Sequence, residues 1–260
     1  MMTRPGASAL LRRAFAELLG TGLLVAVVVG SGIMASRLSP GQPGLELLEN
    51  SLVTALGLTV IILMLAPVSG AHLNPVISAA DWALGSGQGG LRPRQLAVYL
   101  PAQVAGAVGG AALANLMFAL PAVSISSKHR SGAQLWLGEV VATAGLVVVI
   151  FALTRSGRGR LVPAAVGAWI GAAYWFTSST SFANPAVTVG RVFSNTFAGI
   201  APSSVPGFVG AQLVGGGLGI VAVRVLYPAW TDAEQGAPVA ASMSSARSGV
   251  PEAGTAVRSS

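Results

Sequence analysis

Six runs of about twenty apolar residues restrict this chain to folds that can cross a lipid bilayer. A helix needs about 20 such residues to span a hydrocarbon core roughly 30 Å thick. The runs cover approximately residues 14–35, 47–68, 95–119, 134–154, 161–180 and 206–228. Because backbone groups inside a bilayer have no water to bond with, each run is predicted to form a transmembrane helix. The sequence therefore predicts an all-α membrane protein.

Composition supports the same class. Of the 260 residues, 53% are hydrophobic and only 9% are charged, whereas about a quarter of the residues of a soluble domain are charged. The absence of cysteine excludes disulfides and thiolate metal sites. The formal net charge of +7 comes from basic residues scattered between the apolar runs. We interpret them as loop anchors at the lipid bilayer, and no nucleic-acid partner is expected.

The distribution of Lys and Arg predicts the orientation. With the N-terminus inside, the cytoplasmic ends of the spans carry Arg4, Arg12, Arg13, Arg92, Arg94, Arg155, Arg158, Arg160 and Arg224. The outer ends carry only Arg37, Lys128 and Arg130. The positive-inside rule then favours cytoplasmic termini in a multi-pass protein of the cell inner (plasma) membrane. The first run continues to Met34, which is long for a cleaved signal peptide, so we expect it to be retained.

The chain repeats the order of its sequence markers. "ELLGTGLLV" starts at Glu17 and "EVVATAGLV" at Glu139, while "AQVAGAVGG" starts at Ala102 and "AQLVGGGLG" at Ala211. Three spans accompany each set of markers. Because three is an odd number, the second set must enter the bilayer from the opposite face, which predicts an inverted repeat.

The repeat predicts the domain organisation. One membrane domain is expected over residues 1–228, with repeat one at about 10–119 and repeat two at about 134–228. Residues 229–260 are rich in Ala, Ser, Gly and Pro and have no apolar periodicity. They are predicted to form a disordered C-terminal tail.

An Asn-Pro pair follows a complete span in each half. The pairs are Asn74-Pro75 in "SGAHLNPVISA" and Asn184-Pro185 in "TSFANPAVTVGR". Asn is a favoured N-cap and Pro a favoured first helical residue, so a helix is predicted to start at each pair. The ten residues 75–84 and 185–194 reach roughly 15 Å as helix, about half of the core. They can enter the bilayer but cannot cross it, which predicts two re-entrant half-helices.

Half-helices that enter from opposite faces bring their N-termini together near the midplane. Non-helical backbone at that depth must be buried or line water, which favours a pore enclosed by the six spans. Each N-terminus carries about half a positive charge, so cations meet a barrier there. The side-chain oxygens of Asn74 and Asn184 are expected to cap their own helices, with the amide groups pointing into the pore as donors. A single Asn-Pro pair most often marks only a turn. Two such pairs at equivalent points of a repeat favour the pore over two unrelated turns.

These stretches resemble a known family. In order, "AELLGTGLLV", "SGAHLNPV", "YLPAQVAGAVGG", "SFANPAV" and "AQLVGGGLG" are similar to the motifs of the aquaporin, or major intrinsic protein, family over about residues 10–228. The resemblance implies an aquaporin-like bundle of six tilted helices and two half-helices, a homotetramer with one pore per subunit, and passive conduction. It also implies that Glu17 and Glu139 are buried carboxylates that hold the re-entrant loops. The alternative is a protonated or snorkelling Glu.

The same resemblance indicates where the pore is narrowest. The constriction is expected at Asn74, Pro75 and Val76 and at Asn184, Pro185 and Ala186, where Val76 replaces the usual Ala. Backbone carbonyls before each half-helix are expected to line the path, because extended backbone there must bond to solute or water. These carbonyls belong to Gly70, Ala71, His72, Ser181, Phe182 and Ala183. The ring of His72 either joins the cytoplasmic half of the pore or packs within its loop.

The outer selectivity filter departs from the family pattern. Most members have an Arg directly after the second Asn-Pro-Ala, whereas this chain has Val187. Arg191 lies one helical turn further on, and either guards the pore or anchors the surface; we favour guarding. Counting without gaps from the Asn-Pro pairs places Thr54, Ala172 and Ser181 at the other filter positions. Tyr174, Trp175 and Phe176 are interpreted as packing or interfacial residues, with pore lining as the alternative.

Small filter side chains predict a wider opening than that of water-selective members, which use bulky aromatic and His residues plus Arg. Because Val187 replaces the usual arginine, this position has no guanidinium group that could donate paired hydrogen bonds to a solute. It also has no positive charge that would exclude cations. More narrowly, "AYWFTSSTSFANPAVT", "VFSNTFAGI" and "VPGFVGAQL" resemble the bacterial aquaporins found beside arsenic-resistance genes. That resemblance implies conduction of arsenite, which is neutral As(OH)3 at pH 7, and of methylated arsenicals. Water or glycerol is the alternative solute.

Two other classes fit less well. An ion-coupled secondary transporter also uses inverted repeats and broken helices, but it needs intramembrane acids for Na⁺ or H⁺. Glu17 and Glu139 are the only clear acids within the spans, and no Asp or Lys relay accompanies them. An enzyme needs a nucleophile with a base or a set of metal ligands; His72 and His129 are predicted on opposite faces. We therefore expect no enzyme activity, no metal and no cofactor, and partners limited to small neutral solutes, water and lipid.

Overall fold

The computed structural model describes residues 7–85 and 90–228. The chain divides into two units, Met1–Tyr227 and Pro228–Ser260. The tail predicted over residues 229–260 lies outside the described residues and stays a prediction.

The helices described in the first unit are α1 (Ala7–Leu38), α2 (Pro43–Ser69), α3 (Pro75–Leu84), α4 (Pro93–Met117), α5 (Ala133–Arg155), α6 (Val162–Phe176), α7 (Pro185–Gly190) and α8 (Val205–Leu226). Three short 3-10 helices accompany them: η1 (Gly159–Leu161), η2 (Arg191–Phe193) and η3 (Pro202–Ser204).

Five of the described helices are long and apolar enough to cross a membrane: α1, α2, α4, α5 and α8 together with η3. The sixth predicted span, 161–180, contains the shorter helix α6, which has 15 residues. At Thr177 the backbone becomes extended, because the chain leaves the helix there to form the loop that leads to Asn184. With the preceding turn η1, α6 still reaches roughly 28 Å, close to the thickness of the hydrocarbon core. The predicted all-α membrane fold is confirmed.

Both half-helices start at the predicted residues. Asn74 caps α3, with its side-chain oxygen accepting from the Val76 N–H at 2.9 Å. Asn184 caps α7 in the same way, accepting from the N–H of Ala186 at 3.0 Å and of Val187 at 3.2 Å. Helix α3 has the predicted length, whereas α7 is α-helical for only six residues and continues as η2. The second half-helix is therefore shorter than predicted as an α-helix.

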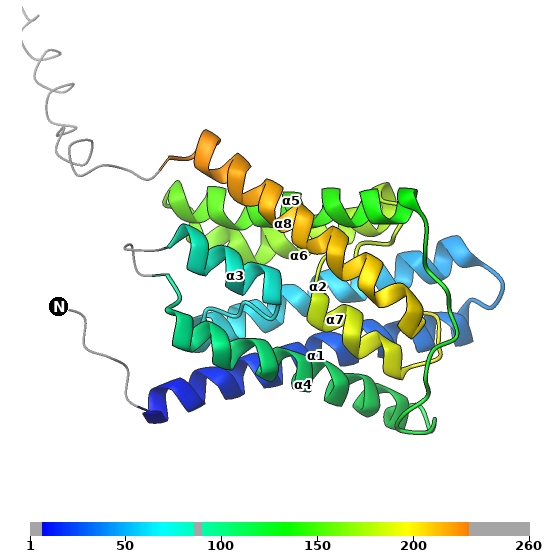
Figure 1. Cartoon of the computed structure of the whole chain (residues 1–260). Coiled ribbons are helices and arrows are strands. Elements are labelled where there is room, and N and C mark those ends of the chain that lie inside the picture. Colours follow the sequence, from blue (N-terminus) through cyan, green and yellow to red (C-terminus); the bar gives the residue numbers. More distant parts are fainter. Residues whose placement is uncertain (1–6, 86–89, 229–260) are drawn as a thin grey trace, which may run out of the picture. The chain divides into compact units, whose positions relative to one another are not determined.

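The two halves of the unit pack alike. In each half the first helix contacts the last, α1 with α4 and α5 with α8, and the two halves meet where α2 contacts α6. Each half-helix contacts the last long helix of the other half, α3 with α8 and α7 with α4. Figure 1 shows that α1 and α5 begin at opposite ends of the unit. We call the end where α1 begins the inner end and the opposite end the outer end.

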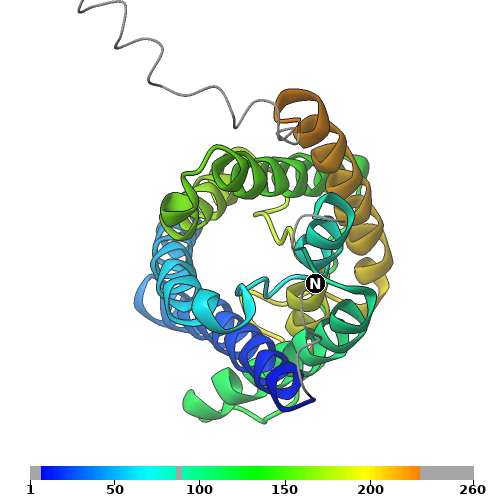
Figure 2. The ribbon, with the colours of Figure 1, turned by 90° about the vertical axis from the view of Figure 1, so that its left-hand side faces the viewer.

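Long helices surround the two half-helices, as the view along the unit in Figure 2 shows. Glycine allows the closest of the helix contacts. A Cβ at Gly106 or Gly110 of α4 would collide with backbone carbonyls of α1, and a Cβ at Gly215 would lie 2.5 Å from the Val140 carbonyl of α5. These glycines bring α4 against α1 and α8 against α5 at backbone distance, which sets the width of the space around the half-helices.

Candidate functional site

A continuous cavity of about 290 Å³ runs through the unit, beside both half-helices. Its lining reaches Thr54 and Tyr174 towards the outer end, and Asp81 and Thr154 towards the inner end. The loops that precede α3 and α7 line its middle. The cavity therefore extends on both sides of the region where the half-helices meet.

The two capping asparagines line this cavity and each one bonds to the opposite loop. The Asn74 amide donates to the carbonyl of Ala183 at 2.7 Å, and the Asn184 amide donates to the carbonyl of Leu73 at 2.7 Å. One of the two amide hydrogens of each Asn is thus used by the protein, which leaves one for a solute. The amides were predicted to point into the pore as donors; each one also crosslinks the two loops.

The other residues of the predicted constriction pack behind the cavity. The lining includes neither Pro75 and Val76 nor Pro185 and Ala186. All four are buried; Val76, for example, packs against Gly216 of α8. These four residues were predicted at the constriction, but the structure places them behind the cavity wall, where they support the half-helices.

Two buried glutamates hold the loops in equivalent ways. The Glu17 carboxylate accepts from the N–H groups of His72 at 3.0 Å and Leu73 at 2.7 Å. The Glu139 carboxylate accepts from the N–H groups of Phe182 and Ala183, both at 2.8 Å. Both carboxylates are 0% exposed. Each also accepts from a glutamine of the last helix in its half: Gln103 for Glu17 at 2.8 Å and Gln212 for Glu139 at 2.7 Å.

The same loops contain backbone in the left-handed region at matching positions. These residues are Gly70, Ala71 and Leu73 before Asn74, and Thr180, Ser181 and Ala183 before Asn184. Their φ angles lie between 46° and 95°. A non-glycine residue in this region costs roughly 1–2 kcal/mol. The carboxylate hydrogen bonds of Glu17 and Glu139 offset that cost, since each such bond contributes about 1.5–3 kcal/mol.

All six residues whose carbonyls were expected along the path belong to the cavity lining, which contains Gly70, Ala71, His72, Ser181, Phe182 and Ala183. The His72 ring both lines the cavity and packs in its loop. Its Nδ1 lies 3.2 Å from the Ser78 hydroxyl, and its Nε2 lies 4.0 Å from the carboxylate of Asp81. Sequence reasoning missed Asp81, although its spacing of seven from Asn74 and four from the lining residue Ile77 places all three on one face of α3.

Three of the predicted filter residues, Thr54, Ser181 and Val187, line the cavity. Ala172 does not, because its side chain is exposed on the outside of α6. The cavity face of α6 is formed by Val166, Ile170 and Tyr174, four residues apart. The count without gaps failed because it passed through loop 177–183, which is not helical. The number of residues in such a loop does not determine which side of α6 faces the cavity. Tyr174 was interpreted as a packing or interfacial residue, with pore lining as the alternative. It lines the cavity, and its hydroxyl lies 3.4 Å from that of Thr54.

Arg191 also lines the cavity and is only 2% exposed. Its Nε donates to the carbonyl of Ala198, and its guanidinium lies 3.4 Å from the centroid of the Phe182 ring. The interpretation of Arg191 as a surface anchor is therefore wrong. The tight turn η2, which begins at Arg191 directly after α7, keeps the side chain beside the passage.

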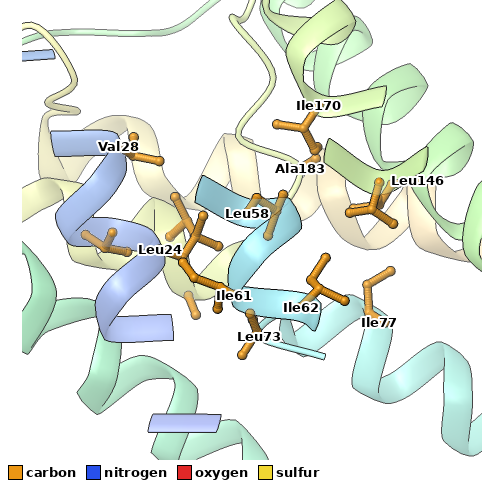
Figure 3. Close-up of a cluster of buried hydrophobic side chains, with 14 of the residues drawn as sticks. Leu24, Val28, Leu58, Ile61, Ile62, Leu73, Ile77, Leu146, Ile170 and Ala183 are labelled. Atoms are coloured by element: carbon orange, nitrogen blue, oxygen red, sulfur yellow. The ribbon is translucent and has the colours of Figure 1, made fainter. Parts of the chain in front are cut away.

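Hydrocarbon forms most of the remaining lining. Figure 3 shows side chains of this group; those that line the cavity include Leu24 and Val28 of α1, Leu58 of α2, Leu146 of α5 and Ile170 of α6. These side chains cannot bond to a polar solute, whereas the loop carbonyls and asparagine amides can. The passage is therefore amphipathic, with apolar walls and a polar path along the two loops.

Comparisons with known proteins agree with this architecture. A family model described as "Major intrinsic protein" matches residues 6–182. The chain is 52% identical over 221 residues to Aquaglyceroporin AqpS of Rhizobium meliloti, covering 85% of this chain and 92% of that protein. It is 33% identical over 279 residues to the Glycerol uptake facilitator protein of Pseudomonas aeruginosa, covering 90% of this chain and 97% of that protein. The X-ray structure of the aquaglyceroporin from Plasmodium falciparum has a similar fold, with a TM-score of 0.62 at 21% identity, over 83% of this chain and 95% of that one.

Proposed function

Because this chain belongs to the major intrinsic protein family, whose members are passive channels and not enzymes, we propose that it conducts small hydroxylated solutes such as arsenite and glycerol, as well as water. As a member of the family it is a multi-pass membrane protein and a channel for small neutral solutes. The proposal concerns which solutes pass. The observation that carries it is the amphipathic cavity of about 290 Å³ with Asn74 and Asn184 at its centre.

Hydroxyl-bearing solutes suit the polar groups at the outer end of this cavity. Thr54 and Tyr174 line the passage, and their hydroxyl oxygens lie 3.4 Å apart. These groups replace part of the hydration shell that a solute loses on entry. The apolar wall further in can accommodate the carbon skeleton of glycerol or the non-hydroxyl side of As(OH)3.

Neutral solutes are favoured over cations for an electrostatic reason. The N-termini of α3 and α7 meet beside the cavity, and each carries about half a positive charge. Arg191 adds a full positive charge to the outer lining. Arg191 is thus proposed to guard the entrance, although it stands one helical turn from the usual family position.

Tyr174 changes the argument about solute size. The four small side chains expected at the filter implied a wide opening, but an aromatic ring and Arg191 both occupy the outer lining. Size alone therefore does not separate arsenite from glycerol, and the hydroxyl groups carry the argument instead. The printed names of the two relatives, an aquaglyceroporin and a glycerol uptake facilitator, favour glycerol as a solute. Arsenite stays a proposal from the sequence resemblance.

Coupling to an ion gradient is disfavoured by the position of the two buried acids. Neither Glu17 nor Glu139 belongs to the cavity lining. Their oxygens accept the loop N–H groups and a glutamine amide. A carboxylate with this many partners holds structure and is poorly placed to carry Na⁺ or H⁺.

The setting of the channel follows from the same arguments. We infer residence in the plasma membrane with cytoplasmic termini, which makes the inner end of the unit cytoplasmic. Figure 1 shows that α1 begins and α8 ends at this inner end. Assembly as a homotetramer is proposed from the family resemblance. Large apolar side chains exposed along α2 and α8 are suited to contact lipid or neighbouring copies.

The test is stopped-flow light scattering of proteoliposomes with osmotic gradients of water alone, glycerol and arsenite. We expect glycerol and arsenite permeabilities clearly above those of protein-free liposomes and independent of Na⁺ and H⁺ gradients. Movement of water alone would contradict the proposal for hydroxylated solutes. Dependence on an ion gradient would instead support the transporter class.

A further inference from the structure

Three cationic side chains bind one short backbone segment at the outer end of the cavity. The segment consists of residues 197–199, and its carbonyls are the acceptors. The hydrogen bonds are Lys128 Nζ to Phe197 O at 2.9 Å, Arg191 Nε to Ala198 O, Arg130 Nε to Gly199 O at 2.9 Å and Arg130 Nη2 to Phe197 O at 3.3 Å. Three positive charges are therefore gathered around three residues.

Two of these cations also face the same aromatic ring. The Cζ of Arg191 lies 3.4 Å and that of Arg130 5.3 Å from the centroid of Phe182. Phe182 and Arg191 both line the cavity. The ring attracts each guanidinium through its quadrupole. The contacts thus hold like charges together next to the passage.

No carboxylate pairs directly with this group in the described part of the chain, although the buried Glu139 lies near enough to interact electrostatically with Arg130 and Arg191. Carbonyl partners satisfy hydrogen bonds but carry no net charge. Within residues 7–85 and 90–228, the one contact of a basic with an acidic side chain within 4.0 Å joins His72 to Asp81, at the other end of the cavity. The outer end is consequently an electropositive pocket with low-dielectric walls, where an anion is attracted more strongly than in open water.

Hydrogen-bond donors at this place are also unused. Only the Nε of the Arg191 side chain has an acceptor in the described part of the chain, so Nη1 and Nη2 remain available. A guanidinium fork matches two oxygens of a phosphate or carboxylate.

From this juxtaposition we propose that the outer end of the cavity binds a small oxyanion, of which inorganic phosphate is the model. Arg191 contacts the anion through Nη1 and Nη2, while Arg130 and Lys128 supply the surrounding positive field. The anion does not pass further, because the next part of the wall, which includes Leu58 and Ile170, cannot solvate a charge. Bound oxyanion therefore occupies the entrance and slows the passage of neutral solutes. This effect rests on the proposed channel function, but the binding itself does not.

The first experiment measures glycerol permeability of proteoliposomes that contain millimolar phosphate on both sides. The comparison is chloride at equal ionic strength, osmolarity and pH. We expect phosphate to reduce glycerol permeability more than twofold. Arg191→Gln, compared with its own phosphate-free rate, is expected to lose this sensitivity.

Arg37→Gln is the matched control variant. Arg37 also lies at the outer end, donates to the carbonyl of Phe118 at 2.8 Å and lies 5.0 Å from the Phe118 ring centroid. Its side chain is exposed and does not line the cavity. Phosphate is expected to inhibit this variant as it inhibits the unmodified chain. Equal loss of sensitivity in both variants would overturn the assignment to Arg191.

Calorimetric titration of the full chain in detergent with inorganic phosphate tests binding without transport. Replacing Arg191 is expected to weaken binding about tenfold or more, because a charge-assisted fork is lost. If Arg191→Gln does not fold, Arg130→Gln replaces it and should weaken binding severalfold, because part of the positive field is lost. Glycerol flux that is unaffected by phosphate, together with no binding heat, would overturn the oxyanion site and leave the channel proposal intact. Absent glycerol flux would contradict the channel proposal, and the titration would still decide the site.

Discussion

The hydroxyl oxygens of Thr54 and Tyr174 lie 3.4 Å apart at the outer end of the cavity. Thr54 comes from α2 and Tyr174 from α6, so the pair joins the two halves of the repeat across the entrance. Both side chains are buried and line the passage. Any solute that enters from the outer end meets these two hydroxyls.

Tyr174 is expected to affect solute selectivity through both its hydroxyl and its ring. Tyr174→Phe removes one hydrogen-bonding group, worth about 0.5–1.5 kcal/mol, so glycerol permeability should fall about two- to tenfold relative to water. Tyr174→Ala should instead admit polyols larger than glycerol. Stopped-flow light scattering measures both, and Ala172→Val serves as control because Ala172 points away from the cavity. An effect of Ala172→Val as large as that of Tyr174→Phe would contradict the assignment.

Val187→Arg is predicted to narrow the passage. Val187 lines the cavity and is 4% exposed, so a long side chain there has no other space to occupy. Its charge would also lie one helical turn from Arg191. We expect glycerol permeability to fall by about tenfold or more, since a steric barrier of only about 1.4 kcal/mol has that effect. Val187→Ala is the control, and it should conduct glycerol at least as fast as the unmodified chain.

Removing the charge of either buried glutamate is predicted to destabilise its loop. In Glu17→Gln or Glu139→Gln the side chain brings an NH2 group where two backbone N–H groups require an acceptor. Loss of one charged hydrogen bond costs about 1.5–3 kcal/mol, which corresponds to a fall of roughly 5–10 °C in the unfolding midpoint. Thermal unfolding in detergent provides the measurement. Glu46→Gln, a half-buried residue at the outer end of α2, should change the midpoint little.

Two neighbouring glycines of α4 allow a test of whether α4 packs against α1 at backbone distance. A Cβ at Gly110 would collide with the backbone of Gly22, whereas a Cβ at Gly109 meets nothing within 4 Å. Gly110→Ala should therefore lower stability by about 1–3 kcal/mol through overpacking. Gly109→Ala should be neutral or slightly stabilising, because alanine has the higher helix propensity. The same thermal unfolding assay compares them; equal midpoints would argue against the close approach of α1 and α4.

Patterns within a few residues of one another were sufficient for most of the fold. The long apolar runs indicated the spanning helices, and each Asn-Pro pair indicated the start of a half-helix, because capping depends on adjacent residues. The matched markers Glu17 and Glu139 indicated the repeat, and the structure places both carboxylates on equivalent loop N–H groups. Length alone also showed that α3 cannot cross a bilayer.

The composition of the filter, in contrast, was decided by the tertiary structure. Tyr174 rather than Ala172 faces the cavity because the rotation of α6 is set by its packing on α2, not by the number of residues before Asn184. Arg191 enters the lining because the chain turns tightly at η2 and folds back, so that the carbonyl of Ala198 accepts from its Nε. The Asn74 amide bonds to Ala183, a residue 109 positions away. The sequence determined which segments form helices and where they start, since those are local properties of the chain; which side chains meet in the passage depends on contacts between segments far apart, and only the folded arrangement sets them.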